Sequence, residues 1–213
     1  MKPVKLSAEG AVDGRRNRSI ATRKKIVAAL TELVREGILA PTAEQVSARA
    51  KVGLRTVFRH FDDMETLYRE MNSQLEPILQ PAQREAIKSG TWQERLHQSV
   101  VVRAGFFEKV MPFYISTLMH RHESPYLHTQ VVQGAKTARE LIGRLLPQKL
   151  SKDRPRFEAI VLVLSIDAWL RLRREQGLSV AAAIKTMQTA VHALIADADE
   201  SSPKASDESN ARR

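Results

Sequence analysis

The segment TAEQVSARAKVGLRTVFRHF, residues 42–61, places two short helical patterns on either side of a tight turn. Thr42 and Gln45 have the spacing of a capping box, so a helix is predicted to begin at Thr42. Apolar positions then recur at three- and four-residue steps, stop at residues 51–53, and restart at Leu54. This spacing is typical of a DNA-reading helix-turn-helix, whose second helix lies in the major groove.

The sequence on both sides of this segment supplies further helices. Residues 18–37 carry one apolar stripe and end at Gly37, which can take a positive φ without steric cost. Residues 62–71 restart a helix that Asp62 or Asp63 is expected to cap. A three-helix head over residues 19–66 is therefore predicted.

The head resembles the N-terminal signature of TetR/AcrR-type transcriptional regulators over residues 23–67. The resemblance is carried by Arg23, Ile26, Ala29, Gly37, Thr42, Val46, Ala50, Val52, Thr56, Leu67 and the run Phe58-Arg59-His60-Phe61. It implies an all-α homodimer whose larger C-terminal domain binds a small molecule and thereby changes the DNA affinity of the heads. The DNA-binding positions that it implies here are Arg23, Thr42, Gly53, Arg55, Thr56, Phe58, Arg59 and His60.

Within that set, Arg55 and Thr56 are expected to read bases, whereas Arg23, Thr42, Arg59 and His60 are expected to hold the DNA backbone.

Several positions depart from the family pattern. Lys51 stands where the family usually has glycine, so it must adopt a left-handed conformation or the turn is rearranged. Phe58 replaces a usual tyrosine, Met64 a common phosphate-contacting lysine, and Gly53 a common serine cap. These changes remove hydrogen-bond donors that would otherwise face DNA.

Positive charge is concentrated at the N-terminal end. Residues 15–60 hold 11 of the 34 Lys and Arg side chains but only three of the 24 acids, in a chain of formal net charge +10. Residues 1–18 are interpreted as a flexible basic arm that contacts DNA through Arg15, Arg16 and Arg18. A solvated terminus without DNA contact is the alternative.

The remainder of the chain is predicted to form one helical ligand-binding and dimerisation domain, residues 67–197, followed by a disordered tail, residues 198–213. With no cysteine, the chain has no disulfide, thiolate zinc site or cysteine nucleophile. No apolar run approaches the roughly 18 residues of a membrane span, and the expected location is the cytoplasm.

The last two predicted helices, residues 155–176 and 179–196, are apolar on more than one face. Dimer contact through these helices is expected, with an intrachain core as the alternative. The residues with suitable spacing are Ile160, Val163, Leu164, Ala168, Ile184, Met187, Val191 and Leu194.

A ligand site is indicated less specifically. Candidate residues are Arg103, Phe107, Tyr114, Tyr126, Asp167 and Trp169, although aromatic residues at helical spacing more often form ordinary core. Asp167 lies within AIVLVLSIDAWL, where an unpaired buried carboxylate would be costly. It would face a ligand, or pair with Arg171 or Arg103.

The sequence gives no reason to expect an enzyme, a cofactor or a metal site. His120, His122 and His128 cluster in sequence, but His120 and His122 point to different sides of a helix. The predicted function is that of a DNA-binding transcriptional regulator, in particular a homodimeric repressor released from a palindromic operator by a small-molecule effector. A helical ligand-binding protein with a degenerate head and a non-specific basic DNA binder are the alternatives.

Overall fold

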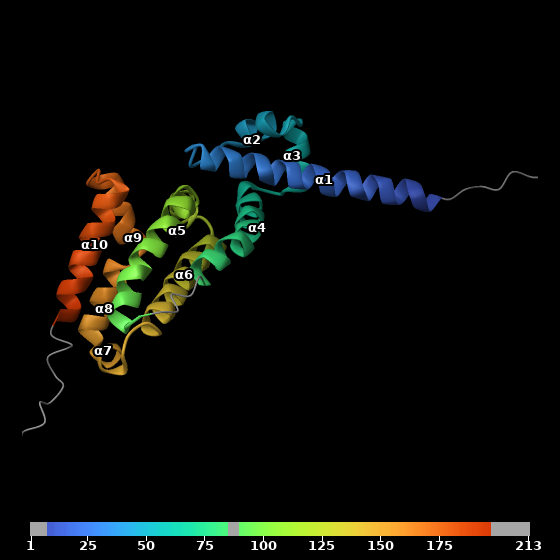
Figure 1. The fold of residues 1–213 in the computed structure, drawn as a ribbon. Helices are drawn as coiled ribbons and strands as arrows, with labels where there is room; N and C mark the ends of the chain where they lie inside the picture. Colours follow the sequence, from blue (N-terminus) through green and yellow to red (C-terminus); the bar gives the residue numbers. More distant parts are fainter. Residues whose placement is uncertain (1–7, 85–89, 197–213) are drawn as a thin grey trace, which may run out of the picture. The chain divides into compact units, whose positions relative to one another are not determined.

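The computed structural model describes residues 8–84 and 90–196, and every regular element in these ranges is a helix, which confirms the all-α prediction (Figure 1). The predicted tail and residues 1–7 of the predicted arm lie outside the described residues. The elements in chain order are α1 (Ala8–Arg35), α2 (Ala43–Ala50), α3 (Leu54–His60), α4 (Met64–Arg84), α5 (Trp92–His120), α6 (Pro125–Gly143), α7 (Gln148–Lys152), α8 (Arg154–Val163), α9 (Ile166–Leu170), the π-helical η1 (Arg171–Glu175) and α10 (Val180–Ile195).

The chain divides into two compact units that interleave in sequence. The first contains residues 1–84 and 109–133, and the second contains residues 85–108 and 134–213. The predicted linear boundary after residue 66 does not follow this division, because α4 and residues 109–133 group with the head. Phe113 and Leu127 are buried in the same hydrophobic core as the helices of the head, which accounts for the grouping.

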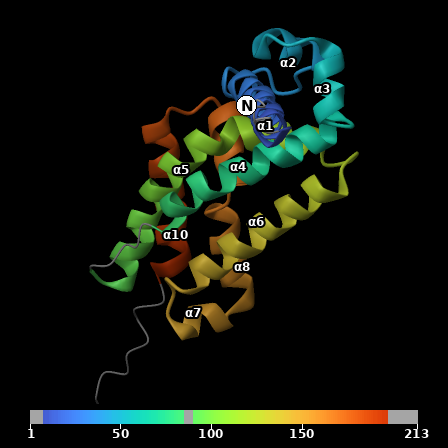
Figure 2. The same ribbon diagram turned by 90° about the vertical axis from the view of Figure 1, so that its right-hand side faces the viewer.

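The head is held by one apolar core. The stripe of α1 is buried as predicted, with Ile26 and Leu30 fully inaccessible to solvent. Val46 of α2, Val57 of α3 and Leu67 of α4 complete this core. Figure 2 views α1 nearly end-on and shows α2 and α3 beside it. Burial of these faces fixes the outward face of α3, because a helix that buries one stripe must expose the other.

The predicted flexible arm is helical where the structure describes it. Residues 8–18 form the first turns of α1 instead of an extended arm. The segment contains no proline, and Arg18 Nε donates to the Gly14 carbonyl oxygen at 3.1 Å, on the same helix. We call Arg15, Arg16 and Arg18 the basic segment of α1; all three are exposed.

The second unit contains α8 and α10 packed against each other. The helix predicted over residues 155–176 is interrupted, because the Ser165 hydroxyl accepts from the Ala168 N–H at 3.1 Å and starts α9 as a new helix. The intrachain alternative holds for half of the predicted dimer residues, which are at most 2% exposed in the single chain: Ile160, Leu164, Met187 and Val191.

Candidate nucleic-acid interface

The start of α2 is fixed by the predicted capping box. Thr42 Oγ1 accepts from the Gln45 N–H at 3.3 Å, and Gln45 Oε1 accepts from the Thr42 N–H at 2.9 Å. Thr42 is exposed at this end of α2. Its hydroxyl therefore stabilises the helix start, and its remaining hydrogen-bonding capacity faces solvent.

The turn between α2 and α3 keeps its left-handed geometry despite the missing glycine. Lys51 has φ 53° and ψ 46°, and it is the one non-glycine residue with positive φ among those described. Its N–H donates to the Ala48 carbonyl oxygen at 3.1 Å, and the Val52 N–H donates to that of Ser47 at 3.0 Å. These bonds close the end of α2, so the turn is strained but not rearranged.

The reading helix α3 begins at Gly53, which caps it without a side-chain bond. Val57 anchors the inner face at 1% exposure. The outer face carries the exposed arginines Arg55 and Arg59 together with Phe58, which is 47% exposed. The predicted outward direction of Arg55 and Arg59 is therefore what the structure shows, and the large exposed ring of Phe58 accompanies them.

Arg23 lies within the head, where its guanidinium already has three contacts. It donates to the His60 carbonyl oxygen, donates to Glu70 Oε2 at 2.9 Å, and stacks 4.2 Å from the centre of the Phe61 ring. These contacts tie α1 to the end of α3 and to α4. Arg23 is thus engaged in positioning α3, and the contact with the DNA backbone that the sequence led us to expect stays a prediction.

Sequence reasoning missed Glu70 as the partner of Arg23. The two residues are 47 positions apart, and the local pattern of α4 contains no signal for this pairing. Only the packing of α1 against α4 brings them together.

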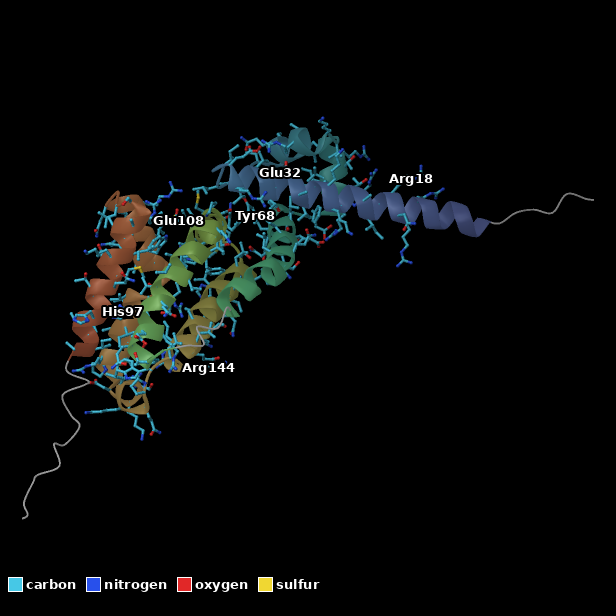
Figure 3. All side chains as sticks on the ribbon, in the orientation of Figure 1. Arg18, Glu32, Tyr68, His97, Glu108 and Arg144 are labelled. Carbon is cyan, nitrogen blue, oxygen red and sulfur yellow. The ribbon has the colours of Figure 1, made fainter. Side chains whose placement is uncertain are left out.

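The positive charge of the head is mostly unneutralised. Of the 11 basic residues between positions 15 and 60, Arg23 and Arg49 alone form ion pairs with side chains in the described ranges. Arg49 binds Glu36 at 2.6 Å and Glu32 at 3.5 Å. Glu32 lies on the part of α1 next to α2 (Figure 3), and Glu36 directly follows the end of α1. Figure 3 shows Arg18 of the basic segment on the part of α1 that extends beyond α2 and α3.

The electrostatics around His60 reflect this excess. Partial burial lowers the pKa of the His60 imidazole, and the positive charges of Arg59 and Arg23 lower that pKa further. A nearby phosphate would act in the opposite direction, because it favours the charged imidazolium. The head therefore presents α3 with a positively charged outer face.

The head matches the family profile described as "Bacterial regulatory proteins, tetR family" over residues 26–71. The head of this chain is a TetR-family head. The matched range begins inside α1 and ends inside α4, so it covers α2, α3 and the turn around Lys51.

Solved structures share the fold of this chain. A transcriptional regulator from Rhodococcus sp. Rha1 superposes with a TM-score of 0.63 at 13% identity, covering 82% of this chain and 96% of its own. A protein described as a TetR-family transcriptional regulator from Mesorhizobium loti MAFF303099 superposes with a TM-score of 0.58 at 17% identity, covering 84% and 97%. A search of curated proteins finds no match. At these identities the likeness concerns the fold.

The predicted ligand residues do not gather in one unit of this chain. Tyr114 and Tyr126 belong to the first unit, where Arg69 stacks 4.7 Å from the centre of the Tyr126 ring. The other four belong to the second unit: Arg103, Phe107, Asp167 and Trp169.

Within the second unit, Trp169 is fully buried and pairs with the α5 segment. Its ring centre lies 6.3 Å from that of Phe107, and its Nε1–H donates to Glu108 Oε1 at 2.9 Å. Glu108 also binds Arg173 at 2.8 Å, which lowers the pKa of its carboxyl group. Burial lowers the pKa of the Arg103 guanidinium to about 10.

The premise that Asp167 is buried is wrong. Its side chain is exposed in the first turn of α9, because the break at Ser165 turns this segment away from the continuous apolar helix that the sequence predicted. An acid in this position complements the positive end of the helix dipole.

In the ranges that the structure describes, no three His, Cys, Asp or Glu side chains come together as a metal site. None of the described helices combines the length and the hydropathy that a membrane crossing requires.

Proposed function

We propose that this protein is a homodimeric TetR-family repressor that binds a palindromic operator and is released by a small-molecule effector. The observation that carries the DNA-binding part is the outer face of α3, where Arg55 and Arg59 are exposed without ion pairs among the described side chains. Because its target is DNA, we place this activity in the cytoplasm.

The outer face of α3 can read two kinds of base edge. Arg55 in the first turn suits the O6 and N7 acceptors of guanine in the major groove. Leu54 and Phe58, 37% and 47% exposed, are one helical turn apart and suit the methyl group of thymine. Thr56 adds a hydroxyl, and Arg59 and His60 at the end of the helix suit phosphate. The apolar pair offers base contact where the family's tyrosine hydroxyl is missing.

Dimerisation is supported by apolar surface that remains outside the core of the second unit. Leu162 of α8 is 66% exposed and Val180 of α10 is 37% exposed. Large apolar side chains at this exposure favour burial by a partner, and a C2 dimer would present two reading helices to a palindrome.

Release by an effector requires a physical connection to the reading head. In the first unit, the Ser124 hydroxyl donates to Glu65 Oε1 at 2.7 Å, and Arg69 stacks on Tyr126. Both contacts join the start of α6 to α4, which follows α3 directly. A ligand that changes these contacts would bind with different affinity to the state of the protein that binds DNA and to the state that does not, as effector coupling requires.

The experiment that tests this proposal starts with selection of a duplex from a random pool by the full-length protein. Arg55→Ala should weaken binding to the selected duplex by about 1–3 kcal/mol and leave binding to random duplex unchanged. Arg144→Ala is the matched control, because it removes one exposed arginine from the second unit. It should change neither affinity.

The other outcomes identify the alternatives. Equal losses on selected and random duplexes with Arg55→Ala would indicate a non-specific DNA binder. Selection that yields no preferred sequence and no duplex binding would indicate a ligand-binding protein with a degenerate head.

A further inference from the structure

Four buried polar atoms of the first unit have no hydrogen-bond partner among the described residues: Tyr68 Oη, Asn72 Nδ2, Ser116 Oγ and His120 Nε2. They form two pairs at i,i+4 spacing, one on α4 and one on α5, so each pair occupies one helix face. The Tyr68 and His120 ring centres lie 4.4 Å apart, which brings the two faces together. We call these four residues the polar cluster (Tyr68 is labelled in Figure 3).

The polar cluster is set in apolar surroundings. Tyr68 is 2% exposed and Ser116 is fully buried. Met71, Leu75 and Phe113 are buried in the core to which Tyr68 belongs. Buried polar groups normally have partners, since removal from water without a replacement bond is unfavourable. Four such groups converging from two helices point to a hydrogen-bonding molecule as their partner.

The polar cluster is uncharged at neutral pH. Burial raises the pKa of the Tyr68 hydroxyl to about 12, and the nearby Ser116 hydroxyl opposes this rise less strongly. Burial lowers the pKa of the His120 imidazole, and the Glu123 carboxylate only partly opposes this. A charged molecule would lose its hydration here and find no opposite charge within the cluster.

We propose that the polar cluster binds a small uncharged molecule that carries a carbonyl or hydroxyl group on an apolar body. The Tyr68 hydroxyl and the Asn72 amide donate to its oxygen, and Ser116 and His120 complete the hydrogen bonding. The apolar body packs among the surrounding core side chains. Resting on the function proposed above, this assigns the chemical class of the effector and the residues that recognise it.

The location of the polar cluster explains how such a molecule affects DNA binding. Tyr68 and Met71 share one hydrophobic core with α1 and with Val57 of the reading helix. Only residues 61–63 separate α3 from α4. A molecule bound at the polar cluster therefore displaces side chains of the core that supports α3, and this changes the population of the DNA-binding state.

The test uses the full-length protein and compounds of matched shape. Acetophenone, 1-phenylethanol and benzamide are the uncharged probes, and benzoate is the charged counterpart. Binding is measured by ligand-observed NMR and by the change in melting temperature. The variant Tyr68→Phe/Ser116→Ala removes both hydroxyls and keeps the apolar shape of the site.

The control is Ser99→Ala, which removes one buried hydroxyl from another part of α5. Ser99 already donates to the Leu96 carbonyl oxygen at 2.6 Å, so its hydroxyl belongs to a different environment. We expect at least one uncharged probe to bind the unaltered protein and the control variant, and to bind the Tyr68→Phe/Ser116→Ala variant at least tenfold more weakly. Benzoate should bind none of them.

Three results overturn the proposal: no uncharged probe binds, benzoate binds equally well, or the Tyr68→Phe/Ser116→Ala variant binds the probes unchanged. A variant that melts higher while probe binding stays the same would show that the cluster holds only water, which also overturns it. Operator affinity without probe is recorded for every protein. Failure of the proposed function appears there as inability of the unaltered protein to select a duplex, whatever the probes do.

Discussion

Replacing Lys51 by glycine should stabilise this protein, because Lys51 is held at φ 53° and ψ 46° at the end of α2. A residue with a Cβ in this region is destabilised by roughly 1–2 kcal/mol. Glycine relieves that strain but adds conformational freedom to the unfolded chain, and this entropy offsets about 0.5–1 kcal/mol of the gain in stability. The two main-chain bonds of the turn are retained, since both donors are backbone N–H groups. The expected net gain is about 0.5–1 kcal/mol.

For a chain of this length, that gain corresponds to an increase in melting temperature of about 1–4 °C. It should be measured by urea and thermal unfolding of the full-length chain at one fixed protein concentration, because dimerisation makes both quantities depend on concentration. Circular dichroism at helical wavelengths reports the transition.

Lys51→Ala separates backbone strain from charge. It removes the ammonium group but keeps the Cβ, so it should not gain the stability of Lys51→Gly. If the two variants unfold at the same urea concentration and temperature, relief of the left-handed strain is not the cause and the reasoning fails. Both variants lose one positive charge beside the reading helix, so their DNA affinities should fall together.

Arg23→Met should lower the free energy of unfolding by about 1–2 kcal/mol, since it removes a carbonyl bond and a partly exposed ion pair; unchanged urea unfolding would show that these contacts do not hold α3. Neutralising the basic segment of α1 should flatten the log–log dependence of DNA affinity on salt by up to about 0.9 for each phosphate that the segment no longer neutralises, and an unaltered slope would place the segment away from DNA. The free energy of unfolding should fall as the pH drops below the ordinary histidine pKa of about 6.5, because the pKa values of His60 and His120 are lowered in the folded state and the unfolded chain binds more protons. The slope for each histidine should not exceed about 1.4 kcal/mol per pH unit, and unfolding curves that coincide between pH 5 and 7 would contradict this prediction. Leu162→Glu should weaken self-association at least tenfold in sedimentation experiments, whereas Val132→Glu, at 40% exposure in the first unit, should not.

Local sequence signals were sufficient for the helix caps and the buried stripe of the head. The Thr42 capping box, the positive φ of Gly37 and the cap at Asp63, which accepts from the Thr66 N–H at 2.7 Å, all follow from side chains within a few positions. The apolar stripe of α1 likewise identified its buried face. These features involve short-range bonds and helical periodicity, which one sequence displays directly.

The errors came from weak local signals. The residues of the predicted arm contain two glycines, Gly10 and Gly14, which lower helix propensity without preventing a helix, and the structure continues α1 through them. Ser165 resembles any other serine within a helical pattern, yet it caps a new helix and leaves Asp167 exposed. A helix break of this kind forms when a hydroxyl accepts a hydrogen bond from a backbone N–H three residues later. This capped conformation and an uninterrupted helix are close in free energy.

The sequence by itself determined that the protein is all-α, that it carries a helix-turn-helix head, and that Lys51 is the unusual residue of the turn. Only the tertiary structure decided that Arg23 holds α3 through Glu70, that α4 and residues 109–133 join the head, and that Tyr68 and Asn72 meet Ser116 and His120. These contacts join residues about 45 positions apart or more. Which helix faces meet depends on the packing of the whole core, and one sequence does not display that arrangement.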